Sequence, residues 1–342
     1  MNINYICVIL LINFIFLLSF YKVSNYLNLF DIPDFKRKIH TKKTSLVGGL
    51  LFFIFLLIYN VFFLLNYFEN FLNPRDLFGL TLVASFFFFL GLYDDKYNLK
   101  PNSKLFLMIF FILFLILFNK NFVVEEIIFG FLDKKFLLGD LKYIFTIICV
   151  LCFINAANMF DGIDLQFGLY SIFLSVIFIY KGLLINFAIG IILCSIFFLY
   201  LNFKKKIFVG NSGTLLISAL FSFLIIISYT KHNSFLVEEI FLLMSIPGFD
   251  LMRVTFLRLS QGIHMFHPDM KHIHHLLIKR HSLIFTNFLI QTSIIVPVFI
   301  YYYFNNFLLS LILSLIVYLL LIYNAKKKNI KLVIFLKRKF LL

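Results

Sequence analysis

Residues 213–230 read GTLLISALFSFLIIISYT, a stretch without a single charged side chain. As an α-helix it would be roughly 27 Å long, close to the hydrocarbon thickness of a bilayer. Similar uncharged runs recur along the 342 residues, of which 62% are hydrophobic and only 14% charged. A soluble domain is nearer half apolar and a quarter charged. The sequence therefore predicts a membrane protein.

The uncharged runs on both sides of this stretch predict an all-α, polytopic fold with about eleven transmembrane helices. The expected spans are 3–21, 47–66, 77–93, 104–118, 143–157, 165–180, 183–201, 213–230, 236–257, 284–303 and 307–324. Segment 119–142 mixes acids, lysines and apolar residues, which is typical of a small hairpin or an interfacial helix. One transmembrane domain over 1–324 and a basic tail over 325–342 are expected.

The distribution of Lys and Arg predicts the orientation. Of the 31 cationic residues, 24 fall on one side of the expected bundle. That side comprises the tail and the loops 22–46, 94–104, 158–164, 202–212 and 253–283. Cytoplasmic loops carry the excess of cations, so we expect an outside N-terminus and a cytoplasmic C-terminus in the inner (plasma) membrane. Because the cations lie in short loops between apolar spans, nucleic acid is not an expected partner.

Half of the 16 acidic residues lie on the predicted cytoplasmic side, and all eight are aspartates. They are Asp31, Asp34, Asp94, Asp95, Asp161, Asp164, Asp250 and Asp269. Carboxylates at the ends of membrane helices are costly unless they are paired or bind a metal. Short oxygen ligands suit a hard divalent cation. The pattern indicates a functional cluster.

Asp94 and Asp95 end the third span in GLYDDKYNLKPNSK. Adjacent side chains on a helix diverge by about 100°, so one can face a metal while the other meets a lysine or an acceptor phosphate. Lys104 opens the next span and can face the same site or extend to the membrane surface. Alone, a DD pair at a helix end is more typical of a solvated turn.

The segment NAANMFDGID holds Asn155, Asn158, Asp161 and Asp164. The first three are spaced by three residues, so they would share one helical face. Gly162 permits a sharp bend that would bring Asp164 back toward that face. Two asparagines alone would be explained by interhelical hydrogen bonds, but the adjacent acids favour a site.

The loop FVGNSGTLL opens the eighth span. Gly210 and Gly213 would let the backbone approach a phosphate, and Ser212 or Thr214 could cap the helix. An ordinary helix-capping loop has the same pattern.

The segment HPDMKHIHHLLIKRH carries the candidates His272, His274 and His275. Zinc is an alternative, but no cysteine is near and no HExxH pattern is present. Together with Arg253 and Arg258, the imidazoles are better suited to donate hydrogen bonds to phosphate oxygens.

The order of these motifs resembles that of the polyprenyl-phosphate N-acetylhexosamine-1-phosphate transferases, notably the bacterial enzymes that begin O-antigen or enterobacterial common antigen synthesis. The resemblance runs from about Asp31 to His275. It rests on DIPDFKRKIH with LVGG, the DD pair, NAxNMxDGID, a GxxG loop and PDxxHIHHLL.

The resemblance implies transfer of N-acetylhexosamine-1-phosphate, with GlcNAc-1-phosphate the first candidate, from a UDP-sugar to undecaprenyl phosphate, with release of UMP. It implies Mg²⁺, or Mn²⁺ as a substitute, and leaves a homodimer open. The roles it assigns to residues follow. Catalytic residues would be Asp94, Asp95, Lys104, Asp161 and Asp164; metal ligands Asp94, Asp95, Asp161 and Asn211; substrate-binding residues Lys38, His40, Asn155, Asn158, Arg253, Arg258, His272, His274 and His275.

Three positions depart from the family pattern. Asn211 stands where the family usually has Asp, Leu165 where it has Gly, and Met270 where it has Arg. A neutral Asn211 should weaken Mg²⁺ binding, and Met270 removes a bidentate phosphate donor. Asn211 and Met270 keep a non-catalytic relative as an alternative. A transporter or lipid-handling protein is a further alternative, because acids at the membrane edge also mark ion pathways. Transport would favour polar residues near mid-span and two related halves, which the sequence lacks.

Overall fold

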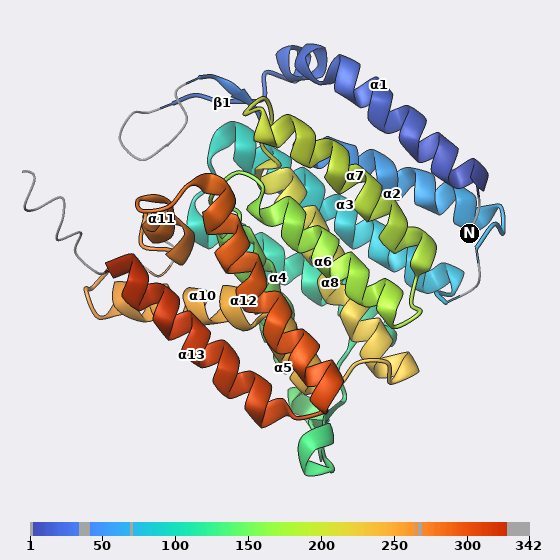
Figure 1. The fold of residues 1–342 in the computed structure, drawn as a ribbon. Helices are drawn as coiled ribbons and strands as arrows, with labels where there is room; N and C mark the ends of the chain where they lie inside the picture. The colour runs from blue at the N-terminus through green and yellow to red at the C-terminus, as the bar shows by residue number, and fades with distance from the viewer. Residues whose placement is uncertain (1–2, 34–41, 69–70, 264, 266–268, 327–342) are drawn as a thin grey trace, which may run out of the picture.

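The computed structural model describes residues 3–33, 42–68, 71–263, 265 and 269–326 (Figure 1). Most of them are helical. The helices are α1 Ile3–Leu27, α2 Gly48–Leu64, α3 Pro74–Tyr97, α4 Pro101–Phe118, α5 Lys142–Phe160, α6 Gln166–Tyr180, α7 Ile185–Phe203, α8 Gly210–His232, α9 Val237–Leu243, α10 Ser245–Leu259, α11 Ile273–Ile278, α12 Leu283–Phe304 and α13 Phe307–Lys326. The strands β1 Phe30–Asp31 and β2 Thr44–Ser45 pair antiparallel, as do β3 Glu126–Phe129 and β4 Lys134–Leu137.

Eight helices in the described part of the chain are long and apolar enough to cross a membrane, and nine if α9 and α10 count as one bent span. Helices α2 and α6 are apolar but shorter. The structure thus confirms a polytopic helical protein. The count of eleven spans and the orientation stay predictions.

The expected span 236–257 is broken into two helices, α9 and α10, which are bent by 70° relative to each other. Pro247 has no backbone N–H to donate, and its ring would clash with the carbonyl group of Leu243 in a continuous helix. Chain direction therefore changes at Met244. The bend turns α10 toward the end of the bundle that carries the predicted site.

Helix α8 is the centre of the bundle. Its most apolar stretch is 94% buried, whereas α1, α4 and α13 bury only 22% of theirs. A helix that is apolar on all sides is expected inside the protein. Helix α8 packs against α2, α3 and α5, and the first turn of α8 lies at the predicted site.

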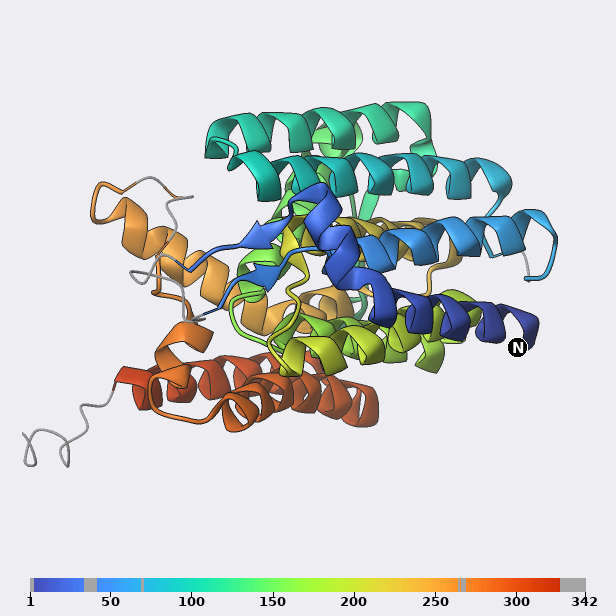
Figure 2. The same cartoon turned by 90° about the horizontal axis from the view of Figure 1, so that it is seen from above.

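The two ends of the bundle differ (Figure 2). The β1–β2 pair and α11 lie at one end, and the N-terminus of α1 lies at the other. The β3–β4 pair gives segment 119–142 the hairpin form rather than the interfacial helix, and Phe131 in its turn contacts Phe307 at the start of α13. Strand β2 also extends toward the loop before α8, since Phe208 N donates to Ser45 O.

Candidate active site

The carboxyl group of Asp95 caps the N-terminus of α8. Its Oδ1 accepts hydrogen bonds from the backbone N and the side-chain Nδ2 of Asn211, at 2.8 and 3.0 Å, and its Oδ2 accepts from Ser212 N at 3.0 Å. No side chain of α8 caps the helix itself, so the expected capping by Ser212 or Thr214 is wrong. The negative charge of Asp95, which belongs to α3, thus lies at the positive end of the α8 dipole and stabilises it.

The glycines in the first turn of α8 serve close packing. Gly210 has φ +71°, and a Cβ there would lie 2.6 Å from Asp95 Oδ2. A Cβ on Gly213 would lie 2.8 Å from Gly49 Cα. The sequence predicted that these glycines would let a phosphate come close to the backbone. In the structure the Asp95 carboxylate and α2 come close to it instead.

Lys104 lies between Asp94 and Asn211. Its Nζ donates to Asp94 Oδ2 at 2.9 Å and to Asn211 Oδ1 at 3.1 Å, and Asp94 Oδ1 accepts from Leu99 N. Lys104 therefore faces the cluster rather than the membrane surface. The two adjacent aspartates diverge as predicted, one to a lysine and the other to a helix terminus.

The central motif leaves its helix earlier than predicted. Helix α5 ends at Phe160, so Asp161 lies beyond the face shared by Asn155 and Asn158. Asn158 Oδ1 accepts from Thr214 Oγ1 at 2.6 Å, which joins α5 to α8, whereas Asn155 donates to Leu151 O of its own helix.

Asp161 is in a strongly negative environment. Burial, followed by the charges of Asp164 and Asp95, raises the pKa of Asp161 to about 8. No hydrogen bond from a described residue lowers the pKa of this carboxyl group. A cation beside Asp161 would favour its ionised form.

The bend after Asp161 depends on Leu165 rather than on Gly162. Leu165 has φ +73°, a left-handed conformation that Gly adopts more easily. Asn202 at the end of α7 supports the bend, because its Oδ1 accepts from Leu165 N at 2.6 Å and its Nδ2 donates to Asp164 Oδ1 at 3.3 Å. Gly162 is required for another reason: a Cβ there would lie 1.8 Å from His274 Nε2.

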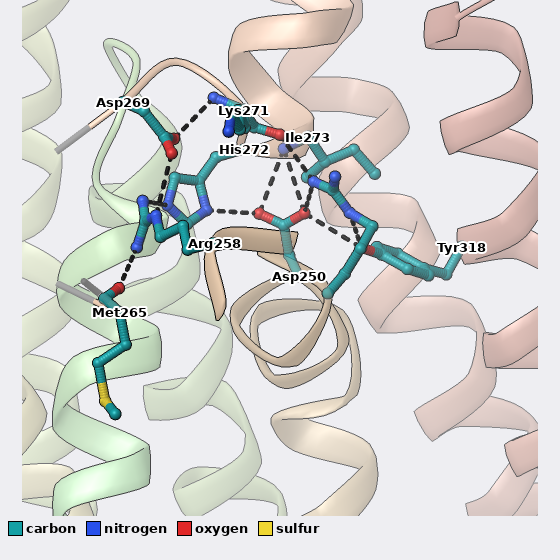
Figure 3. A network of polar contacts seen from close by, with 9 residues as sticks. Asp250, Arg258, Met265, Asp269, Lys271, His272, Ile273 and Tyr318 are labelled. Carbon is teal, nitrogen blue, oxygen red and sulfur yellow. Dashed lines mark hydrogen bonds and ion pairs between the residues drawn. The ribbon is translucent and has the colours of Figure 1, made fainter. Parts of the chain in front are cut away.

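A buried polar network holds the histidine segment (Figure 3). Asp250 accepts from His272 Nδ1 at 2.8 Å, from Arg253 at 2.6 Å and from Tyr318 at 3.1 Å. Arg258, 2% exposed, donates to Asp269, to Met265 O and toward His272 Nε2. These contacts occupy both arginines within the protein.

His274 lies against the central motif. His274 is 1% exposed and packs against Gly162, and neither of its ring nitrogens has a hydrogen-bond partner among the described residues. Burial lowers the pKa of His274 well below its usual range. Burial, with the charge of the nearby Lys279, lowers the pKa of His275 to about 4. Both imidazoles are therefore neutral at pH 7.

The acids can be tested as ligands for a divalent cation. Among the described residues, no His, Cys, Asp and Glu side chains form a group of three or more that could hold a metal ion. Mg²⁺ does not need one, because it keeps several waters and binds through one or two carboxylates and substrate phosphates. Asp161, with its raised pKa beside Asp95 and Asp164, fits such a cation. Asn211 fits less well, since its side-chain oxygen accepts from Lys104.

The predicted residues thus converge from distant parts of the chain. The structure brings together Asp94, Asp95, Lys104, Asn158, Asp161, Asp164, Asn211, His274 and, behind them, His272. Lys38 and His40 lie outside the described residues. Sequence reasoning did not select Asn202 or Tyr318, which carry no motif, and it named Asp250 only as one acid among eight. The catalytic, binding and metal roles stay predictions.

The model of glycosyl transferase family 4 matches residues 77–229 of this chain, from α3 into α8. The resemblance indicated by the motifs is confirmed. The stretch includes both aspartate motifs and the GNSG loop.

Among individual proteins, the chain is similar to the undecaprenyl-phosphate alpha-N-acetylglucosaminyl 1-phosphate transferase of Escherichia coli K12, with 25% identity over 79% of this chain and 75% of that protein. The Yersinia pestis protein of the same name is 26% identical over the same shares. A probable undecaprenyl-phosphate N-acetylglucosaminyl 1-phosphate transferase of Bacillus subtilis is 27% identical over 72% of this chain and 68% of that protein.

Proposed function

We propose that the protein transfers N-acetylhexosamine-1-phosphate, with GlcNAc-1-phosphate the first candidate, from a UDP-sugar to undecaprenyl phosphate at the cytoplasmic face of the plasma membrane. The observation that carries the proposal is the meeting of Asp95, Asp161 and the histidine segment beside Lys104 at one end of the bundle. The similarity to undecaprenyl-phosphate transferases over most of the chain supports the acceptor.

In the proposed reaction, an oxygen of the lipid phosphate attacks the phosphorus that carries the sugar. A new P–O bond forms, the bond from that phosphorus to the bridging oxygen breaks, and UMP leaves with the bridging oxygen. The product is a lipid-linked pyrophosphoryl sugar. The two reactants are both anionic, so catalysis rests on positioning and charge neutralisation.

The residues divide these tasks. Lys104 supplies positive charge beside Asp94 and is held by two hydrogen bonds. Asp95 keeps the first turn of α8 in place. Asp161 would bind Mg²⁺ together with oxygens of the substrates, and the bound ion would neutralise phosphate oxygens. The unpartnered nitrogens of His274 could hydrogen-bond a polar group of the donor.

The direct test is UMP release by the purified full-length protein supplied with undecaprenyl phosphate, Mg²⁺ and a UDP-N-acetylhexosamine. We expect release that depends on the lipid and stops when EDTA removes the metal. A panel of UDP-GlcNAc, UDP-GalNAc and their non-acetylated counterparts identifies the donor. Absence of UMP release with every donor would exclude the proposed activity.

A further inference from the structure

The three histidines of the segment HIHH have different environments. His272 has both ring nitrogens within hydrogen-bond distance of buried charged groups, Asp250 and Arg258. Within the part of the chain that the structure describes, neither ring nitrogen of His274 has a hydrogen-bond partner. The HIHH segment therefore contains one histidine, His272, whose two ring nitrogens are both held by other side chains, and one, His274, whose ring nitrogens are not.

The protonation of His272 follows from its partners. A carboxylate only accepts hydrogen bonds and a guanidinium only donates them. Nδ1 must therefore carry the proton that Asp250 accepts, and Nε2 must accept from Arg258, which defines a neutral imidazole. The surrounding charges agree, because Asp250 and Asp269 balance Arg253 and Arg258 in pairs at 2.6 and 3.0 Å.

The same side chains hold the backbone on both sides of His272 (Figure 3). Asp250 accepts from Ile273 N at 3.2 Å, and Arg253 donates to Lys271 O at 2.8 Å. Two residues beyond His272 in the chain, His274 is pressed against Gly162 of the central loop. Helix α10 thus fixes the start of α11, and α11 places His274.

We infer that His272 is a positioning residue, a neutral tether between Asp250 and Arg258, and that it sets His274 against the central loop without contacting the reactants. The inference rests on the proposed function only for its kinetic consequence. The tether itself is a property of the fold.

Amide substitutions test the tether. Asn can place an N–H near the position of Nδ1 and keep the shorter, charge-assisted bond to Asp250, whereas Gln reaches toward Nε2 and keeps the longer bond to Arg258. In the full-length protein, we expect His272→Asn to have the highest melting temperature and turnover of the three variants, His272→Gln intermediate values and His272→Phe the lowest. His272→Asn should keep most of the melting temperature and turnover that His272→Phe loses. His274→Leu should not lower the melting temperature, since it removes unpaired buried nitrogens, yet it should reduce turnover at least tenfold.

Melting and turnover separate the possible failures. A His272→Phe variant that melts like the parent would overturn the tether. So would a His272→Asn variant that melts like the parent but loses turnover as completely as His274→Leu, because His272 would then act on a reactant. If the parent itself shows no turnover, the proposed function fails, and the order of melting temperatures still decides the tether.

Discussion

At the scale of single residues, Asp94 and Asp95 show what a sequence can and cannot predict. Their divergence follows from helix geometry, and it is observed. Their partners are set by tertiary contacts, so no local pattern indicated that the amides of α8 would be taken by Asp95. The sequence of the GNSG loop therefore predicted a site for a bound anion. In the fold, the anionic group at this position is the side chain of Asp95.

Leu165 should carry strain. A non-glycine residue in the left-handed region costs roughly 1–2 kcal/mol, against about 0.5–1 kcal/mol of chain entropy lost by Gly. We expect Leu165→Gly to be as stable as the parent or up to about 1 kcal/mol more stable in thermal or denaturant unfolding. Leu165→Val, which is β-branched, should be less stable than both. A Gly variant clearly weaker than the parent would show that packing of the leucine outweighs its backbone strain.

His275 should make the fold sensitive to mild acid. Its pKa is lowered to about 4 in the fold, against about 6.5 in an unfolded chain. Between these values the unfolded state binds the proton and the folded state does not, so stability falls as pH decreases from about 6.5 to 4. Melting curves over this range should show a smaller acid loss for His275→Gln than for the parent. Equal losses would mean that His275 is not held neutral by the fold.

At the scale of elements, glycines set the distance of α8 from its neighbours. A Cβ on Gly91 of α3 would lie 2.3 Å from Asn211 O, and one on Gly49 of α2 would lie 2.3 Å from Gly213 N. The clashes are with backbone, which cannot rotate away. These contacts hold the ends of α2, α3 and α8 together where Asp95 caps α8.

Gly91→Ala should therefore push α3 away from α8. Overpacking costs about 1–3 kcal/mol, and the shift should also weaken the Asp95 cap and reduce turnover. The matched control is Gly248→Ala in α10, where an added Cβ meets nothing within 4 Å. We expect the control to melt at or above the parent temperature, because Ala favours helix more than Gly. Similar behaviour of the two variants would refute the close packing of α3 on α8.

Element boundaries were predictable where composition changes and missed where it does not. The apolar run 236–257 gave no sign of a break in hydropathy, although Pro247 lies within it. A proline kink and a full break look alike in sequence, because the outcome depends on what the second half packs against. Here the charged side chains of α10 bind the segment that leads into α11.

At the scale of the whole molecule, loops from five parts of the chain meet at one end of a helical bundle. The charge asymmetry and the motif order predicted that convergence, and the described residues bear out its geometry. The pairings inside the site were not predictable, since Asn202, Tyr318 and Thr214 lie in ordinary apolar or loop sequence and gain meaning only through their partners.

The most direct measurement is mass-spectrometric detection of the lipid-linked pyrophosphoryl sugar made by purified parent, Asp161→Asn and Asp133→Asn proteins of equal folded fraction. Asp133 lies in the turn between β3 and β4 and provides a charge-matched control. We predict product from the parent and from Asp133→Asn, and at least a hundredfold less from Asp161→Asn. Equal product from all three proteins would contradict the proposed site, and product from none would contradict the proposed reaction.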